Sequence, residues 1–183
     1  MTDTIFTVQA QTFVNYLTDW QSRLPSLAFH QAITEPQHTA ILSIDVTNGF
    51  CYEGPLASPR VQLIVSPIVA LFKKAWDIGL RSILLLQDTH DPQAVEFSQW
   101  PPHCVAGTTE AEPVPEIKAL PFYDQINIFP KNSINPALNT ELPEWIMNHP
   151  EIKTYITVGD CTDLCTYQLA MYLRTDANAR QIE

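Results

Sequence analysis

The fold is decided by the stretch Val158-Gly159-Asp160-Cys161-Thr162-Asp163-Leu164-Cys165-Thr166-Tyr167-Gln168. The β-branched and aromatic run 154–158 leads into it and has the length of a strand, which Gly159 ends. Thr162 or Asp163 is a suitable N-cap for a helix over about 164–174. Cys165 is therefore expected in the first turn of a helix, where free N–H groups and the helix dipole favour a thiolate and can bind an oxyanion. A buried, unreactive cysteine is the alternative.

Composition indicates a water-soluble globular chain. Its 183 residues suit one domain with a short appendage, and 45% of them are hydrophobic. The formal net charge of −10 argues against nucleic acid or an anionic membrane as a partner. No segment resembles a membrane span or a signal peptide, so we expect a cytoplasmic location. In that compartment Cys51, Cys104, Cys161 and Cys165 are expected as thiols rather than disulfides.

Strand-like and helix-like segments alternate along the chain. A predicted helix at 7–24 belongs to an N-terminal helical extension, residues 1–38, and the main domain is expected at 39–183. Continuous apolar runs of strand length suit a parallel sheet that is covered on both faces. The remaining predictions are strands at 40–45, 81–87 and 126–129, helices at 67–80 and 142–148, and a long loop after the second strand. This order indicates an α/β fold with a mostly parallel sheet.

Three strands are each followed by a residue that can do chemistry. Asp45 closes the first strand, Lys131 follows the third, and Cys165 comes one turn after the fourth. The carboxyl ends of parallel strands share one edge of a sheet, so these side chains can meet in one cleft. There Lys131 would hold Cys165 as a thiolate, and Asp45 would move protons between thiol, leaving amine and water. Taken singly, Asp45 can be a loop cap and Lys131 an exposed surface lysine.

A second group of polar residues lies in and before the long loop. It contains Asp88, His90, Glu96 and His103, whose oxygen and imidazole ligands suit zinc, iron or manganese. Each has an ordinary interpretation as a loop residue, and Asp-x-His by itself is a common pattern. Together they predict a divalent metal site, most plainly for zinc.

Five segments together resemble the isochorismatase-like cysteine hydrolases, and among them the nicotinamidases. The similarity runs from about residue 40 to residue 174. The segments are Ile44-Asp45-Val46-Thr47-Asn48-Gly49-Phe50, Asp88-Thr89-His90, Trp100-Pro101-Pro102-His103-Cys104-Val105-Ala106-Gly107-Thr108, Phe129-Pro130-Lys131 and Gly159-Asp160-Cys161-Thr162-Asp163-Leu164-Cys165.

The resemblance implies a three-layer α-β-α domain and a metal-assisted amidase that converts nicotinamide to nicotinate and ammonia through an acyl-thioester. It implies a catalytic triad, a metal site with Glu96 where many members have a further histidine, and a homo-oligomer. It also implies a cis peptide bond between Asp160 and Cys161, and an oxyanion hole formed by the N–H groups of Cys161 and Cys165. The residues so assigned are Asp45, Lys131 and Cys165 for the triad, Asp88, His90, Glu96 and His103 for the metal, and Phe50 and Trp100 beside a pyridine ring whose nitrogen binds the metal.

The chain departs from the family pattern at three points. Gly49 stands where an acid is frequent, and Asp160-Cys161 replaces an apolar-Ala pair, which can reshape the pocket. The family domain also normally continues with two further parallel strands after the helix that follows Cys165, whereas the sequence here ends near that helix. A shortened sequence, a smaller sheet and a sheet completed by a partner are the three alternatives. The alternatives are another amide or ureido hydrolase of the family, a non-catalytic ligand-binding member, and a thiol-redox pair formed by Cys161 and Cys165.

Overall fold

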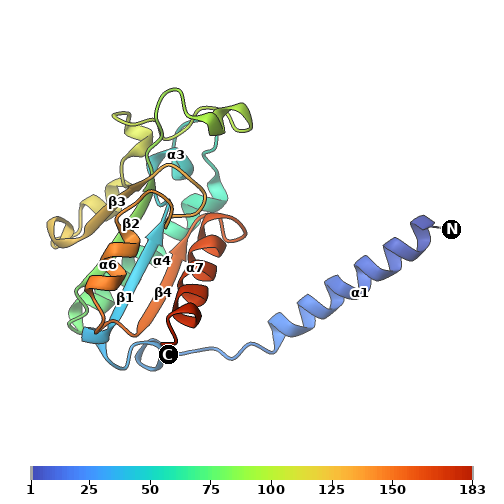
Figure 1. Cartoon of the computed structure of the whole chain (residues 1–183), viewed down its shortest axis with the longest axis horizontal. Helices are drawn as coiled ribbons and strands as arrows, with labels where there is room; N and C mark the ends of the chain where they lie inside the picture. Colours follow the sequence, from blue (N-terminus) through green and yellow to red (C-terminus); the bar gives the residue numbers. More distant parts are fainter. Residues whose placement is uncertain (1, 183) are drawn as a thin grey trace. The chain divides into compact units, whose positions relative to one another are not determined.

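Four parallel strands form the centre of the main unit. They are β1 (Thr39–Ile44), β2 (Ser82–Asp88), β3 (Asn127–Lys131) and β4 (Thr154–Gly159), in the spatial order β3-β2-β1-β4 (Figure 1). Each of the four predicted strands is present, with ends displaced by one or two residues. β1 is buried along its whole length, as its continuous apolar run requires of a strand covered on both faces. The mostly parallel α/β fold is confirmed.

The computed structural model describes residues 2–182, and side chains from residue 7 onward. Its contacts divide the chain into two units, Met1–Thr34 and Glu35–Glu183, each described separately below. The first unit contains α1 (Thr2–Ser22), five residues longer at its start than the predicted helix, and the short α2 (Phe29–Ala32). Within the described residues, no helix is both long and apolar enough to cross a membrane.

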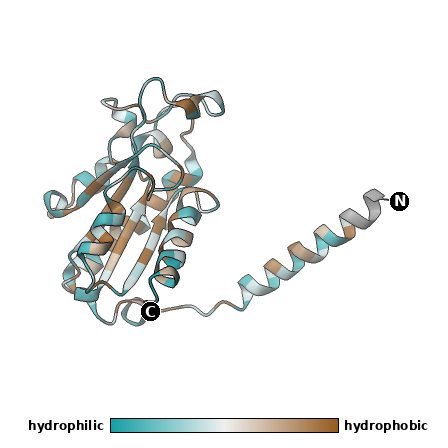
Figure 2. Ribbon diagram, in the orientation of Figure 1, coloured by the Kyte–Doolittle hydropathy of each residue, from teal (hydrophilic) through white to brown (hydrophobic). Residues whose placement is uncertain are grey.

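Helices cover both faces of the sheet, giving the three-layer arrangement that the resemblance implied. α6 (Leu142–Asn148) and α7 (Cys165–Ala179) lie on one face and α4 (Pro59–Asp77) on the other (Figure 1). Side chains alternate along a strand, so alternate residues of β1 and β2 face each layer. The α6–α7 side holds a buried core, and Figure 2 shows the strands as a hydrophobic centre. This core contains Ala40, Leu42, Ile44, Leu84, Leu86, Leu142, Ile146 and Leu169.

Two helix starts differ from the prediction. The helix expected at 67–80 begins at Pro59, where the Ser58 hydroxyl accepts a hydrogen bond from the Arg60 N–H and Pro59 occupies the first turn. Pro67 therefore lies inside α4 rather than at its start. At α7 the N-cap is Leu164, which makes no side-chain cap, so the prediction of Thr162 or Asp163 was wrong. The predicted α6 is confirmed at both ends.

The long loop between β2 and β3 is folded into short helical turns. They are η2 (Val95–Ser98), η3 (Thr109–Ala111), α5 (Pro115–Lys118) and η4 (Tyr123–Gln125). Single β-bridges join Thr47 to Pro113 and His90 to Val105, which holds the loop over the end of the sheet. α3 (Asn48–Cys51), which follows β1, was not predicted.

Gly49 in α3 lies in tight packing under this loop. A Cβ atom at Gly49 would lie 2.5 Å from Cys104 Sγ. No larger residue fits there without moving the loop.

Candidate active site

The carboxyl ends of three neighbouring strands bring Asp45, Asp88 and Lys131 together. Lys131 Nζ lies 2.9 Å from Asp45 Oδ2 and 2.5 Å from Asp88 Oδ1, and all three residues are at most 4% exposed. The Asp88 N–H donates to Asp45 Oδ1 at 2.9 Å. Asp45 has a φ of 54°, so the chain turns sharply as β1 ends and aims this carboxylate across the sheet edge. These contacts form a buried charged cluster at the edge where parallel sheets bind ligands.

Cys165 is the first residue of α7 and lies beside this cluster. Its Sγ is 3.8 Å from Lys131 Nζ, and the residue is buried. Burial raises the pKa of the Cys165 thiol, as do the charge of Asp45 and a hydrogen bond to it, whereas Lys131 lowers it. The protonated thiol is therefore favoured here, because the Lys131 ammonium is engaged more closely by two carboxylates. The predicted thiolate accordingly requires transfer of its proton to a neighbouring base.

Asp45 has the properties of that base. Burial and the nearby charge of Asp88 raise the pKa of Asp45 to about 7, although Lys131 acts in the opposite direction. A carboxylate with a pKa near neutrality can both accept and return a proton at physiological pH. Asp88 differs: burial alone would raise its pKa, but hydrogen bonds with His103 and His90 and the charge of Lys131 hold it well below its usual range. The two carboxylates are thereby suited to different roles.

Asp88 also belongs to a buried group that could hold a metal ion. One ligand atom from each of Asp88, His90 and His103 lies within 4.8 Å of the others. His90 Nε2 is 3.4 Å and His103 Nε2 is 3.7 Å from carboxylate oxygens of Asp88. His103 Nδ1 is 2.9 Å from the Pro101 carbonyl oxygen, which orients the ring. His90 Nδ1 is buried without a hydrogen-bond partner, and His90 Nε2 has only its long approach to Asp88, so a bound cation suits this set.

The fourth predicted ligand, Glu96, lies outside that three-residue group. It lines the same pocket from η2, so it stays a predicted ligand rather than a member of the cluster. Phe97, next to it, packs edge-on against both histidines, with ring centroids 5.4 Å from His90 and 5.7 Å from His103. Phe97 therefore helps to fix the two imidazole rings, a role that its place in a loop did not indicate.

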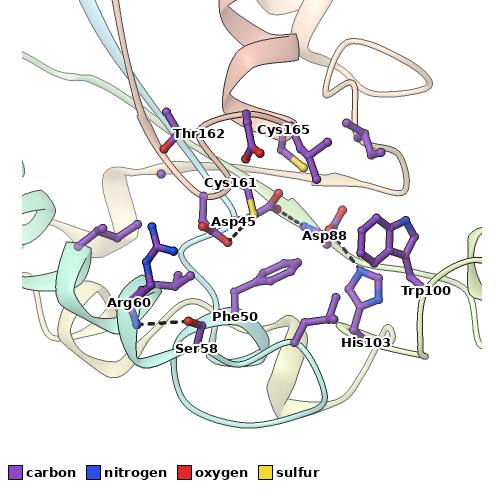
Figure 3. A pocket seen from close by; sticks show the side chains of 18 of the residues that line it. Asp45, Phe50, Ser58, Arg60, Asp88, Trp100, His103, Cys161, Thr162 and Cys165 are labelled. Atoms are coloured by element: carbon purple, nitrogen blue, oxygen red, sulfur yellow. Dashed lines mark hydrogen bonds and ion pairs between the residues drawn. The ribbon is translucent and has the colours of Figure 1, made fainter. Parts of the chain in front are cut away.

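A pocket of about 640 Å³ opens over the cysteine and the metal-ligand group (Figure 3). Phe50 and Trp100, which are the residues expected beside a pyridine ring, both line it. The Phe50 ring meets the His103 ring edge-on, with centroids 5.6 Å apart, and Trp100 is 39% exposed at the rim. In Figure 3, Arg60 and Ser58 occupy the end of the view opposite Trp100 and His103. The pocket thus combines an aromatic end beside the metal ligands with a more polar end.

Several pocket residues were not predicted from the sequence. They come from the start of α4, from the loop after β3 and from the turn between β4 and α7: Ser58, Arg60, Val61, Ile64, Ile134, Thr162 and Asp163. The Ser58-Pro59 pair is a helix-start signal that would have located the first group. A helix that connects β1 to β2 begins near the carboxyl end of β1, so its first turn faces the same cleft as Asp45.

The turn before Cys165 contains the cis peptide bond that the resemblance implied. The peptide bond between Asp160 and Cys161 is cis, and both residues line the pocket. Cys161 Sγ lies 3.4 Å from Asp160 Oδ2. Burial and the Asp160 charge raise the pKa of Cys161 to about 12, so this second thiol is also protonated at neutral pH. The first N–H groups of a helix lack intrahelical acceptors, which leaves that of Cys165 free to face a ligand.

The chain matches known proteins across this whole region. The model of the isochorismatase domain matches residues 39–175. Nicotinamidase 1 of Arabidopsis thaliana is 29% identical, with 76% of this chain and 60% of the plant protein covered, so the chain spans about three fifths of that relative's length. Among solved structures, the N-carbamoylsarcosine amidase of Thermoplasma acidophilum has a TM-score of 0.66 at 23% identity and covers 79% of this chain and 78% of its own. The pyrazinamidase of Pyrococcus horikoshii in complex with zinc has a TM-score of 0.64 at 22% identity, covering 75% and 79%.

These two structures share the fold with this chain. The region that the domain model matches contains all four strands together with Asp45, Lys131 and Cys165. The curated match adds a likeness to nicotinamidases. The chain therefore belongs to the isochorismatase family.

Proposed function

We propose that the protein is a cysteine amidohydrolase that converts nicotinamide to nicotinate and ammonia. The observation that carries this proposal is the convergence of Asp45, Lys131 and Cys165 on one pocket beside the Asp88–His90–His103 group. The likeness to a plant nicotinamidase supports the substrate class. The aromatic end formed by Phe50 and Trp100 is suited to a flat heteroaromatic ring.

The proposed reaction uses Asp45 as a proton carrier. The Cys165 thiol gives its proton to the Asp45 carboxylate, and the sulfur attacks the carboxamide carbon. Asp45 returns this proton to the amide nitrogen, the C–N bond breaks, and ammonia leaves an acyl-thioester on Cys165. Asp45 then takes a proton from a water molecule while the water oxygen attacks the thioester carbon. The C–S bond breaks, and Asp45 returns that proton to the sulfur of Cys165. Each cycle consumes one amide and one water and regenerates the free thiol.

The charges around the thiol support these steps. Lys131 stays protonated, because the charges of Asp45 and Asp88 raise its pKa in spite of burial. Its ammonium stabilises negative charge on the sulfur and compensates the negative charge of the Asp88 carboxylate. The N–H groups of Cys161 and Cys165 are the proposed donors to the oxyanion. A divalent ion held by Asp88, His90 and His103, with Glu96 as a further candidate ligand, would supply a Lewis acid that orients the substrate.

A second candidate is hydrolysis of a larger carboxamide or an ureido compound. The pocket volume of about 640 Å³ lies in the range that accommodates drug-sized molecules, well above the need of one pyridine ring. Arg60 offers a polar group away from the aromatic end, and Asp160 is a further polar residue of the lining. Such a substrate would need Arg60 for binding, whereas nicotinamide would not.

Ammonia release from nicotinamide tests the proposal directly. We expect turnover by the zinc-loaded protein. Cys165→Ala should lower the rate by at least about 1,000-fold, because the proposed acyl-thioester forms on the sulfur of Cys165. Cys51→Ala is the matched control, since this thiol is buried outside the pocket. Unchanged activity in Cys165→Ala would refute the nucleophile. No activity on nicotinamide, with turnover of a carbamoyl or larger amide that Arg60→Ala weakens, would instead support the second candidate.

A further inference from the structure

Helix α1 (Thr2–Ser22) exposes large hydrophobic side chains along its length. Phe13 is 61%, Leu17 is 41% and Trp20 is 50% exposed. Figure 2 shows hydrophobic residues distributed along this helix among hydrophilic ones. A helix of this length is only marginally stable by itself in water, and its β-branched and aromatic residues are poor helix formers. Its stability therefore depends on packing against a partner.

The spacing of these residues matches helix-to-helix packing. The apolar residues at positions 10, 13, 17 and 20 are separated by intervals of three, four and three residues, which places them in one stripe, at the a and d positions of a heptad pattern. On the opposite side of the helix the residues are polar, apart from Val8. The stripe, here called the α1 stripe, consists of Ala10, Phe13, Leu17 and Trp20.

The charges of α1 select the class of partner. Residues 2–22 contain no lysine or arginine, so the helix lacks the basic face of helices that bind membranes or nucleic acid. Asp19 is paired with Arg23 just past the helix end, at 2.6 Å. The flanks of the α1 stripe carry uncharged residues such as Gln9, Tyr16 and Gln21. In a chain with a net charge of −10, this is a surface on which a second copy can approach without repulsion between like charges.

We propose that the α1 stripe packs against the α1 stripe of a second copy of this chain. The contact joins two chains through their N-terminal units. The proposal does not rest on the proposed reaction, because the residues given for the pocket all belong to the second unit.

Site-specific photo-crosslinking of the full chain tests where α1 makes its contact. p-Benzoylphenylalanine is placed at Leu17, in the α1 stripe, or at Val8, on the opposite side, in a mixture of ¹⁴N- and ¹⁵N-labelled chains. We expect position 17 to give mixed-isotope dimers whose crosslinked peptides both come from residues 2–24, and position 8 to give few. Crosslinks from position 17 that map only to residues 35–182, or no covalent dimer, would overturn the proposal.

The strength of association provides a second readout. Sedimentation of the wild-type chain should show a species of twice the 20.7 kDa chain mass. The double variant Phe13→Gln/Leu17→Gln removes four apolar side chains from each dimer and should raise its dissociation constant by at least about 100-fold. Val8→Gln is the matched control and should leave that constant unchanged. A monomeric wild type, a double variant that dimerises as the wild type does, or an equal effect of Val8→Gln would each refute the α1 contact.

Discussion

Replacement of Lys131 by Met tests whether this ammonium holds the site together. Its Nζ contacts Asp45 at 2.9 Å and Asp88 at 2.5 Å. At an effective dielectric constant of about 20, each contact corresponds to an attraction of about 6 kcal/mol. Two effects offset part of this: the cost of burying the ammonium disappears, and Asp45 can neutralise itself by taking up a proton. We expect a net loss of about 3–5 kcal/mol in the free energy of unfolding, as when one partner of a buried ion pair is removed.

Equilibrium unfolding in urea, with chelator present, measures this loss. At an m-value of about 2–3 kcal/mol/M, the midpoint should fall by about 1–2 M. Lys73→Met, in an exposed position of α4, is the control and should change stability by no more than about 0.5 kcal/mol. Adding Asp45→Asn to Lys131→Met removes one of the two stranded carboxylates and should recover part of the loss. A loss below about 1 kcal/mol, or a double variant less stable than the single one, would refute this account of the cluster.

Two further predictions concern the turn and the metal ligands. Gly159→Ala should lower the free energy of unfolding by at least about 2 kcal/mol, because φ is +124° and a Cβ would lie 2.0 Å from the Ile44 carbonyl oxygen. Gly107→Ala is the control: there is open space around this residue, so the same urea titration should show a smaller loss in the free energy of unfolding. His90→Ala should weaken zinc binding by at least about 100-fold in calorimetry, and His30→Ala, in an exposed position of the first unit, should not. Equal zinc affinity in both histidine variants would show that the metal lies elsewhere.

Local pattern was sufficient for the strands and for the order of the site residues. β1 and β2 are continuous apolar runs, which only a doubly covered parallel sheet accommodates, so their type and their place in the fold followed directly. The position of Asp45 at the end of β1 followed from the same pattern, and the position of Cys165 at the start of α7 followed from the strand and helix signals around Gly159. The start of α4 was misplaced because Pro67, taken as a beginning, is tolerated inside the helix, whereas the Ser58 cap is the true start signal.

Side-chain partners could not be read from the sequence. Lys131 was expected to hold a thiolate, but the register of β3 beside β2 places its ammonium against Asp88, next to Asp45, and 3.8 Å from the sulfur. The pKa of Asp45 depends on the same burial and crowding of charge, which arise only when the three strand ends meet. Arg60 also lines the pocket only because of the tertiary structure, since α4, the helix that connects β1 to β2, begins beside the pocket.

The sequence alone determined the α/β order of elements, the family resemblance and the chemistry available at each strand end, because strand length, apolar continuity and motif residues are local properties. Only the tertiary structure decided which charged groups lie in contact, which imidazoles can share a cation, and how large the pocket is. Those properties depend on distances of a few ångströms between residues far apart in the chain. Water is excluded from such contacts, so small differences in distance and burial set the pKa and binding properties of the site.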